Sequence, residues 1–504
     1  MPRWTLAVGA LGAALLAGAR LLWGRGLLGY AGGEVYGHAW VQWWHGQALP
    51  DWPSGTELAA GADPWPVIDP LVTGLGALLG RGLGYTAGWN LVVLVGFAGA
   101  FLGGAALARR EGGLPWVGGA VLATSTALIG SAASGLTEDL ALGLLAGALA
   151  LLLAPSMGLA LLGGALLGLL AWTGPYLAWM GGVVALGLGA HGIWRDRDSW
   201  KRWLGAALVA LCVAWPAAWL QGERLSGAGH RGGQLLEQSE PLWRVNPWHG
   251  VDLASFVAPG KVDLSGRPLL RLHPGYLGFV ALGLALYGRR SRWWAVLLLG
   301  LVLAPGEQLR LLGEPLGVAN PFAWLLDQVP LGGLFNHHGR FLLIGQLGLA
   351  VLAARGAARL PGRAWLGPAL ALAVALEILL VSPAPLPLPL TDDRIDPIWE
   401  QVSAGPVLPV PAAGPGVHFQ QPLFEQRAHG QALVIEPNRP GYPPGVTRSE
   451  LGRWLGAVHL EPPAELSGLE ATLVVRGSHV PHLTEVLGPP DVEAEGGAIW
   501  VLPR

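Results

Sequence analysis

Long apolar runs separated by short charged loops dominate residues 1–382 of the chain. A membrane-spanning helix needs roughly 20 mostly apolar residues, because the hydrocarbon core is about 30 Å thick and each helical residue rises about 1.5 Å. About eleven stretches meet this requirement, several of them only when their polar ends are included. These stretches are 4–23, 86–108, 115–133, 138–154, 157–173, 175–193, 203–220, 274–288, 292–305, 340–355 and 363–382. The pattern predicts a mainly α fold, a polytopic membrane bundle of about eleven transmembrane helices.

The loops between these helices differ in charge, and this difference predicts an orientation. Lys and Arg are enriched in the short loops that stay in the cytoplasm. With Arg3 inside, the alternation of helices places every dense basic cluster in the cytoplasm, at 109–110, 195–202, 289–292 and 355–363. The long segments 24–85, 221–273 and 306–339 then lie outside. We therefore expect a multi-pass protein of the bacterial inner membrane with a cytoplasmic N-terminus.

The pattern changes after a Pro-rich stretch at 383–390, which predicts a stiff extended linker. Residues 391–504 predict a small soluble α+β domain on the periplasmic or extracellular side. Its expected strands are 407–410, 432–435, 472–475 and 498–502, and its expected helices are 449–458 and 480–487. Ser449 is the expected N-cap of the first of these helices.

Composition and charge narrow the classes of function. Of the 504 residues 52% are hydrophobic and 13% charged, against roughly 25% charged in an ordinary soluble protein. The 31 Lys and Arg nearly cancel the 33 Asp and Glu, which excludes a basic nucleic-acid binder. The single Cys212 excludes an internal disulfide framework and a Cys-based zinc site. The expected cytoplasmic loops are too short for a nucleotide-binding fingerprint, which argues against an ATP-driven pump.

The first external segment predicts an amphipathic helix at the membrane interface. At 100° per residue, one face carries four aromatic residues, Tyr36, Trp40, Trp43 and Trp44. The other face carries four polar ones, Glu34, His38, Gln42 and His45. Such a helix would present a carboxylate and two imidazoles just above the bilayer. The alternative is an interfacial anchor whose polar face is only hydrated.

Four further acidic residues lie on the external side, and each has two interpretations. Asp63 and Asp69 could bind a metal or a sugar, but each precedes a proline, as in ordinary turns. Asp69 also fits as an N-cap, with Pro70 at the first position of a short helix. Glu138 and Asp139 either serve a site beside the membrane core or oppose the dipole of a helix that Thr137 caps.

A basic cluster, His337, His338 and Arg340, lies at the start of a late apolar helix. Arg340 is unfavourable at a helix N-terminus, so we expect an anionic partner near it. Three cationic groups at the membrane surface would suit a lipid phosphate or pyrophosphate. The alternative is contact with lipid headgroups.

These features together resemble the GT-C superfamily of integral-membrane glycosyltransferases. The resemblance rests on an acidic residue, Glu34, after the first spanning helix, the run of membrane helices, the late stretch 337–341 and a terminal external domain. It implies transfer of a sugar from a polyprenyl-phosphate or pyrophosphate carrier to an acceptor on the extracytoplasmic side. Glu34 would be the base for the acceptor hydroxyl, or would hold a divalent metal.

The same resemblance implies that His337, His338 and Arg340 bind the donor phosphate. His38, His45, Asp63, Asp69, Glu138 and Asp139 are the further candidates for substrate binding. Many members have two acidic residues in the first loop, whereas here Glu34 stands alone unless Asp63 or Asp69 completes the site.

Two other functions remain open at this point. One is a non-catalytic membrane scaffold or assembly subunit, with the terminal domain as its docking module. The other is a transporter or flippase, which predicts charged groups at the bilayer midplane. Glu377 is the clearest such charge in the expected spans.

Overall fold

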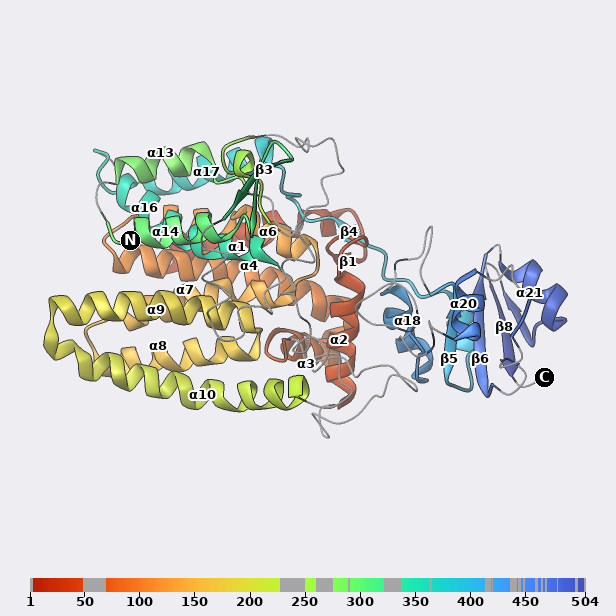
Figure 1. The fold of residues 1–504 in the computed structure, drawn as a ribbon. Helices are drawn as coiled ribbons and strands as arrows, with labels where there is room; N and C mark the ends of the chain where they lie inside the picture. The colour runs from red at the N-terminus through yellow and green to blue at the C-terminus, as the bar shows by residue number, and fades with distance from the viewer. Residues whose placement is uncertain are drawn as a thin grey trace.

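The computed structural model describes residues 3–48, 69–226, 250–259, 275–288, 291–320, 337–361, 365–412 and, with short gaps, 418–502. A bundle of roughly parallel and antiparallel helices forms the larger part, and a small α+β domain lies beyond one end of it (Figure 1). We call these parts the membrane body and the C-terminal domain. The mainly α architecture with a terminal α+β domain agrees with the fold class expected from the sequence.

Each apolar stretch predicted to cross the membrane contains a helix. In chain order they are α1 (Arg3–Ala17), α4 (Tyr85–Arg110), α5 (Pro115–Ala123), α6 (Thr126–Ala133), α7 (Leu142–Leu152), α8 (Met157–Leu169), α9 (Pro175–Arg195), α10 (Trp200–Ser226), α13 (Phe279–Tyr287), α14 (Trp293–Leu303), α16 (Leu342–Ala357) and α17 (Leu366–Val381). In the described part of the chain, five segments are long and apolar enough to span a bilayer. They are 85–110, 115–133, 176–195, 197–220 and 338–357.

Two of the predicted spans are interrupted. The first helix ends at Ala17 and continues after Gly18 as a short 3-10 turn, Ala19–Leu22. The stretch 115–133 breaks between α5 and α6, where Ser125 Oγ accepts the backbone N–H of Leu128 at 3.3 Å. The break therefore places polar side chains of the Thr124–Thr126 segment inside an otherwise apolar span.

Small residues allow the helices of the membrane body to pack closely. A Cβ added at Gly103 on α4 would lie 2.2 Å from the carbonyl oxygen of Gly143 on α7. Close approach of backbones through small residues is typical of helix pairs in membranes, where lipid offers no hydrophobic driving force for association.

The C-terminal domain is built on a four-stranded sheet in the order β5-β6-β8-β7. Its strands are β5 (Val407–Val410), β6 (Ala471–Arg476), β7 (Val492–Ala494) and β8 (Gly497–Leu502), of which only β5 and β6 pair in parallel. Its helices include α18 (Gln421–His429), α20 (Glu450–Ala457) and α21 (His479–Leu487). Ser449 caps α20 as predicted, since its Oγ accepts the N–H of Gly452 at 3.0 Å. The strand predicted at 432–435 is only a single bridge between Val407 and Leu433.

The helix predicted over 34–45 forms as α2 (Val35–Ala48), but its aromatic face does not lie in the membrane interface. Trp40 and Trp44 are 1% and 7% exposed, and they belong to the hydrophobic core of the C-terminal domain. The interface prediction was wrong because aromatic side chains suit a protein core as well as a headgroup layer. In Figure 1, α2 crosses the end of the bundle and faces α18.

The linker also ties the two parts together. The short strand β4 (Leu390–Thr391) pairs antiparallel with β1 (Leu27–Leu28), directly after the first spanning segment. The N–H of Leu388 donates to the carbonyl of Ala17 at 3.0 Å, so the linker lies against the membrane body.

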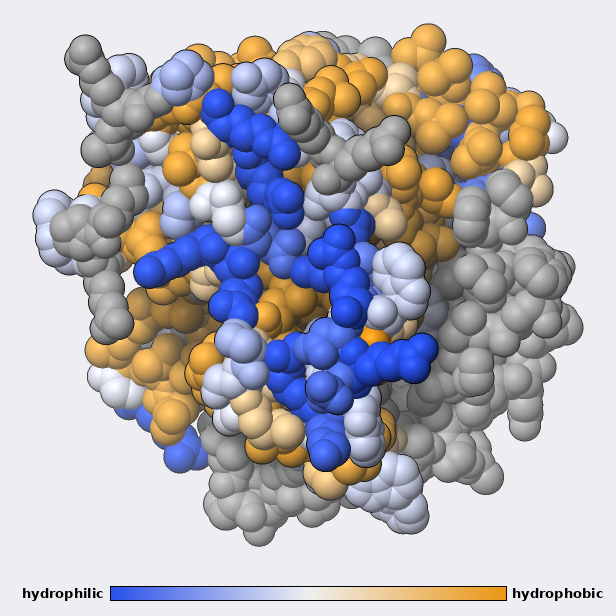
Figure 2. All heavy atoms as spheres, turned by 90° about the vertical axis from the view of Figure 1, so that its left-hand side faces the viewer, coloured by the Kyte–Doolittle hydropathy of each residue, from blue (hydrophilic) through white to orange (hydrophobic). Residues whose placement is uncertain are grey.

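Two further features complete the ends of the bundle. The beginning of the segment 306–339, which was expected to lie outside, contains a hairpin that the sequence did not predict, β2 (Gln308–Leu311) and β3 (Glu314–Ala319). Figure 2 shows the end of the bundle far from the C-terminal domain, where hydrophilic side chains form a band across an apolar surface. The exposed charged residues at the helix ends and in the loops of this region include Arg109, Arg110, Arg195, Asp196, Arg197, Asp198 and Lys201.

Candidate active site

The polar face of α2 lies against the membrane body. His38, Gln42 and His45 are 1%, 1% and 2% exposed, although the sequence predicted that they would stand at the surface of the membrane. Glu34, in the turn before α2, keeps about a third of its side chain exposed, at 31%. The helix thus buries its imidazoles and leaves the Glu34 carboxylate partly open.

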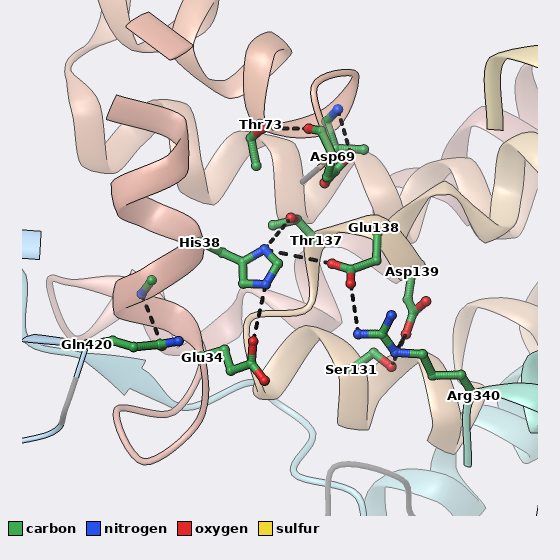
Figure 3. A network of polar contacts seen from close by, with 12 residues as sticks. Glu34, His38, Asp69, Thr73, Ser131, Thr137, Glu138, Asp139, Arg340 and Gln420 are labelled. Atoms are coloured by element: carbon green, nitrogen blue, oxygen red, sulfur yellow. Dashed lines mark hydrogen bonds and ion pairs between the residues drawn. The ribbon is translucent and has the colours of Figure 1, made fainter. Parts of the chain in front are cut away.

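His38 connects Glu34 to the segment between α6 and α7 (Figure 3). Its Nε2 lies 3.5 Å from Oε2 of Glu34, one helical turn earlier. Its Nδ1 lies 3.0 Å from the hydroxyl of Thr137 and 3.7 Å from Oε2 of Glu138. Burial alone would lower the pKa of His38, but the carboxylates of Glu138 and Glu34 outweigh it, and the pKa is raised.

Arg340 joins the same network from the other side. Its Nη2 lies 2.8 Å from Oε1 of Glu138, and its Nε lies 3.5 Å from Oδ2 of Asp139. Asp139 also accepts the hydroxyl of Ser131 at 2.7 Å, and the guanidinium lies 4.6 Å from the centre of the Tyr176 ring. The anionic partner expected for Arg340 is therefore supplied by the protein. Thr137 does not cap a helix here, because its hydroxyl contacts His38.

Asp69 extends the network toward α3 (Val72–Leu83). Its Oδ1 accepts the N–H of Val72, the first residue of α3, at 3.0 Å. This is a capping bond of the kind predicted, but the helix begins later than expected and Leu71 directly precedes it. Burial raises the pKa of Asp69 well above its usual range, and the charge of Glu138 raises it further.

The remaining residues predicted for the site lie farther along. His45 Nδ1 lies 2.8 Å from the hydroxyl of Thr73, which donates to the carbonyl of Asp69, so His45 meets the start of α3. The backbone N–H of His337 donates to the Tyr176 hydroxyl at 2.9 Å, and the His338 ring lies 5.9 Å from that of Phe341. Asp63 lies outside the described residues.

The network carries more carboxylates than bases. Four acidic side chains, Glu34, Asp69, Glu138 and Asp139, surround the two basic ones, His38 and Arg340. Within the described residues, Oδ2 of Asp69, Oε2 of Glu138 and Oδ1 of Asp139 are buried and accept no hydrogen bond. Buried acceptors without donors are costly, so these three oxygens are unusual features of the network.

A metal ion would need a cluster of His, Cys, Asp or Glu ligands. In the described part of the chain, no three such side chains are placed to hold one. His38 stands between Glu34 and Glu138 and keeps their carboxylates from meeting at one point. The arrangement fits acid-base chemistry, and no step below uses a metal.

Some of the network could not be read from the sequence. Ser131 lies in an apolar helix, and Tyr176 follows a Thr-Gly-Pro break, with no spacing that links either to Arg340. Gln420, in the C-terminal domain, accepts the N–H of Gly37 on α2 at 3.3 Å (Figure 3). For the partners of His38 and Arg340 between α6 and α7, the signal in the sequence was the polar segment 137–139 between two apolar helices.

Comparison with known proteins gives a likeness of structure only. Neither a family model nor a curated protein sequence matches the chain. The fold is similar to that of ArnT from Cupriavidus metallidurans in the apo state, at 16% identity and a TM-score of 0.39, covering 98% of this chain and 96% of that one. It is also similar to the same protein bound to undecaprenyl phosphate, at 14% identity and a TM-score of 0.41, covering 98% and 97%.

Proposed function

We propose that the protein is a membrane glycosyltransferase that moves a sugar from a polyprenyl-phosphate carrier to an acceptor hydroxyl. One observation carries the proposal. The partly exposed carboxylate of Glu34 is held by buried His38 at the edge of a network that reaches Arg340 through Glu138. The network lies where α2 crosses the end of a membrane bundle, so a lipid-borne donor could meet a water-borne acceptor there (Figures 1 and 3).

Glu34 has the role of general base in this proposal. Its carboxylate removes the proton from the acceptor hydroxyl while the acceptor oxygen forms a bond to the anomeric carbon. The bond between that carbon and the phosphate oxygen breaks, and its electron pair leaves with the lipid phosphate. His38 contacts the oxygen Oε2 of Glu34 and thereby fixes the orientation of the base.

The excess of carboxylates suits the sugar rather than the phosphate. A sugar leaving a phosphate develops positive charge at the anomeric centre, and nearby carboxylates stabilise such an oxocarbenium-like state. The buried oxygens of Asp69, Glu138 and Asp139 that accept no hydrogen bond would accept sugar hydroxyls. These residues therefore have the role of substrate binding in the proposal.

The donor phosphate needs positive charge, and the predicted source is His337, His338 and Arg340. Arg340 is occupied with Glu138 and Asp139, which leaves part of this role to the neighbouring imidazoles. His337 and His338 are buried, at 9% and 3% exposed, directly before α16. Arg340 follows His338 by two residues in the chain. Its guanidinium would therefore add positive charge beside a phosphate bound by the two imidazoles.

The charges at the far end of the bundle support the proposed orientation of the chain. The exposed basic residues at the ends of α4 and α9 lie opposite the C-terminal domain (Figures 1 and 2). The positive-inside rule assigns that end to the cytoplasm. The site and the C-terminal domain are then periplasmic, in a bacterial inner membrane.

Transfer of a labelled sugar tests the proposal. The purified protein in lipid vesicles would be given polyprenyl-phosphate donors that carry different labelled sugars, together with membrane glycans, lipids and proteins as acceptors. We expect transfer by the wild type and a loss of about 100-fold or more in Glu34→Gln, because general base catalysis contributes roughly 10²–10⁴-fold. Glu400→Gln, at an exposed acid of the C-terminal domain, is the matched control.

Full activity of Glu34→Gln would remove the assigned base. Failure of every donor to react with the wild type, while the protein remains folded and purifies with a second protein, would favour the scaffold alternative.

A further inference from the structure

The first turn of α2 is held by a residue of the C-terminal domain. The N–H groups in the first turn of a helix have no partner within the helix. One of them, that of Gly37, donates to the side-chain oxygen of Gln420 at 3.3 Å. Gln420 is 1% exposed, so its amide is confined at this position.

The contact depends on the absence of a side chain at Gly37. A Cβ added there would lie 2.6 Å from Cδ of Gln420, 2.7 Å from Oε1 and 2.8 Å from Nε2. These separations are shorter than a carbon can tolerate. A methyl group at position 37 must therefore displace either α2 or Gln420.

Other contacts on the same face extend this hold along α2. The indole N–H of Trp40 donates to Oε1 of Gln426 at 2.7 Å, and the rings of Tyr36 and Phe424 lie 5.0 Å apart. Gln420 directly precedes α18, and the other two partners belong to that helix. The C-terminal domain therefore restrains both the rotation and the translation of α2.

The opposite face of α2 carries His38, whose distances to Glu138 and Thr137 depend on where the helix lies. The C-terminal domain also comes close to the base itself. Burial lowers the pKa of His418, two residues before Gln420, and the charge of Glu34 acts against that effect. Glu34 and the segment around Gln420 are thus electrostatic neighbours.

We propose that Gln420 is a positioning residue of the site: by holding Gly37 it sets the distance between His38 and Glu138 and the orientation of Glu34. Its catalytic consequence rests on the proposed function, whereas its effect on the geometry of α2 does not. The C-terminal domain is then an integral part of the site and more than an appended module.

The first test does not depend on activity. The pKa of the His38 imidazole would be measured by NMR in nanodiscs, with His38→Gln used to assign its signal. The charges that face His38 are Glu34 on its own side, and Glu138 and Arg340 from the membrane body. We expect Gln420→Ala and Gly37→Ala each to lower this pKa by on the order of half a unit, since a longer distance weakens the attraction of Glu138.

The double variant distinguishes positioning from general damage. Once Gln420 is truncated, the added methyl group has room, so Gly37→Ala with Gln420→Ala should be no worse than Gln420→Ala alone. Gln421→Ala is the control, because Gln421 donates to Glu425 within the C-terminal domain. Where Gly37→Ala does not fold, Gln420→Met keeps most of the volume, removes the acceptor, and should lower the His38 pKa as well.

Transfer kinetics complete the test. We expect Gln420→Ala to lower kcat about tenfold with little change in KM for the polyprenyl donor, because a misplaced base acts on the chemical step. Wild-type titration of His38 in folded Gln420→Ala and Gly37→Ala would overturn the positioning role, whatever the activity. The expected pKa shifts in a protein that transfers no sugar would uphold the positioning role and refute the proposed function alone.

Discussion

Single residues in the site depend on one another through charge. Arg340 has 4% of its side chain exposed and is neutralised by Glu138 at 2.8 Å and Asp139 at 3.5 Å. Glu138 in turn shares its other oxygen with His38. Removing one partner of a buried pair is costly because the other charge is left without compensation in a medium of low polarity.

We therefore predict that Glu138→Ala destabilises the protein by about 3 kcal/mol, the lower end of the range for broken buried pairs, because Asp139 still contacts Arg340. Thermal unfolding in nanodiscs, followed by circular dichroism, would measure the loss. Asp198→Ala removes an exposed carboxylate at the far end of the bundle and should change little. Equal stability of the two variants would contradict the importance given to this pair.

A second residue predicts a dependence on pH in the C-terminal domain. His429 stacks on Trp399 with ring centres 5.4 Å apart, and burial lowers its pKa to about 4. Its Nδ1 accepts the N–H of Gln431 at 3.0 Å, a bond that protonation of this nitrogen would break. In the unfolded chain His429 binds a proton at its ordinary pKa of 6.5, whereas in the folded domain it does so only near pH 4. The free energy of unfolding of the domain is therefore largest above pH 6.5 and declines as the pH falls toward 4.

Hydrogen exchange of the strands β5 and β6 between pH 7 and pH 4.5 would show this decline. The variant His429→Asn keeps an acceptor near the position of Nδ1 but cannot be protonated there. The protection of its β5 and β6 amides from exchange, relative to that in the wild type, should therefore increase as the pH falls. A constant difference between the two proteins over this range would refute the assignment.

At the scale of elements, the sequence showed which residues share a face but not what covers that face. The two faces of α2 were predicted correctly from 100° spacing, and the polar one carries the site. The aromatic face was expected at the membrane interface, whereas it packs on α18 and its domain. The spacing of apolar residues indicates that a face is buried, but it does not indicate whether lipid or protein covers that face. Gln420 was out of reach for the same reason, since nothing in its sequence context links it to Gly37.

Glu377 shows the same limit for a single charge in an apolar helix. Its carboxylate accepts the N–H groups of Phe279 and Val280 at 2.5 and 2.9 Å and the hydroxyl of Tyr276 at 2.6 Å. Glu377, on α17, therefore caps the N-terminus of α13. This structural role accounts for the charge that was the clearest sequence feature in favour of a transporter. Only the three-dimensional arrangement brings residues about 100 positions apart together.

We predict that Glu377→Gln lowers stability by about 1–3 kcal/mol, because the new NH₂ group replaces an acceptor that faces an N–H donor. Thermal unfolding would measure the change, with Glu314→Gln on the exposed strand β3 as the control. The folded variant should still transfer sugar, since the three hydrogen bonds of Glu377 go to Tyr276, Phe279 and Val280, none of which belongs to the proposed site. Loss of transfer without loss of stability would instead give Glu377 a functional role.

At the scale of the whole molecule, charge is separated between the two ends of the bundle. Basic residues outnumber acidic ones in the exposed loops far from the C-terminal domain, and the acidic network lies beside α2, which faces that domain (Figures 1 and 3). The near-zero net charge of −2 is therefore the sum of two unlike ends. The sequence predicted this separation because loop charges need only the order of the helices, and not their packing.

Reporter fusions test this layout. Fusions after residues 112, 198 and 290 should report the cytoplasm, because each lies in or beside a basic loop. A fusion after residue 504 should report the periplasm. A cytoplasmic signal at residue 504 would place the site on the wrong side for the proposed donor and acceptor.

The most direct measurement is a structure of the protein in nanodiscs with a bound polyprenyl-phosphate sugar. We predict that the sugar lies beside Glu34, with its hydroxyls on Asp69, Glu138 or Asp139 and its phosphate near His337 and Arg340. The lipid chain should enter from the membrane body. Donor density in any other part of the bundle, with the contacts from Glu34 through His38 and Glu138 to Arg340 intact and remote from it, would contradict the assignment of the site.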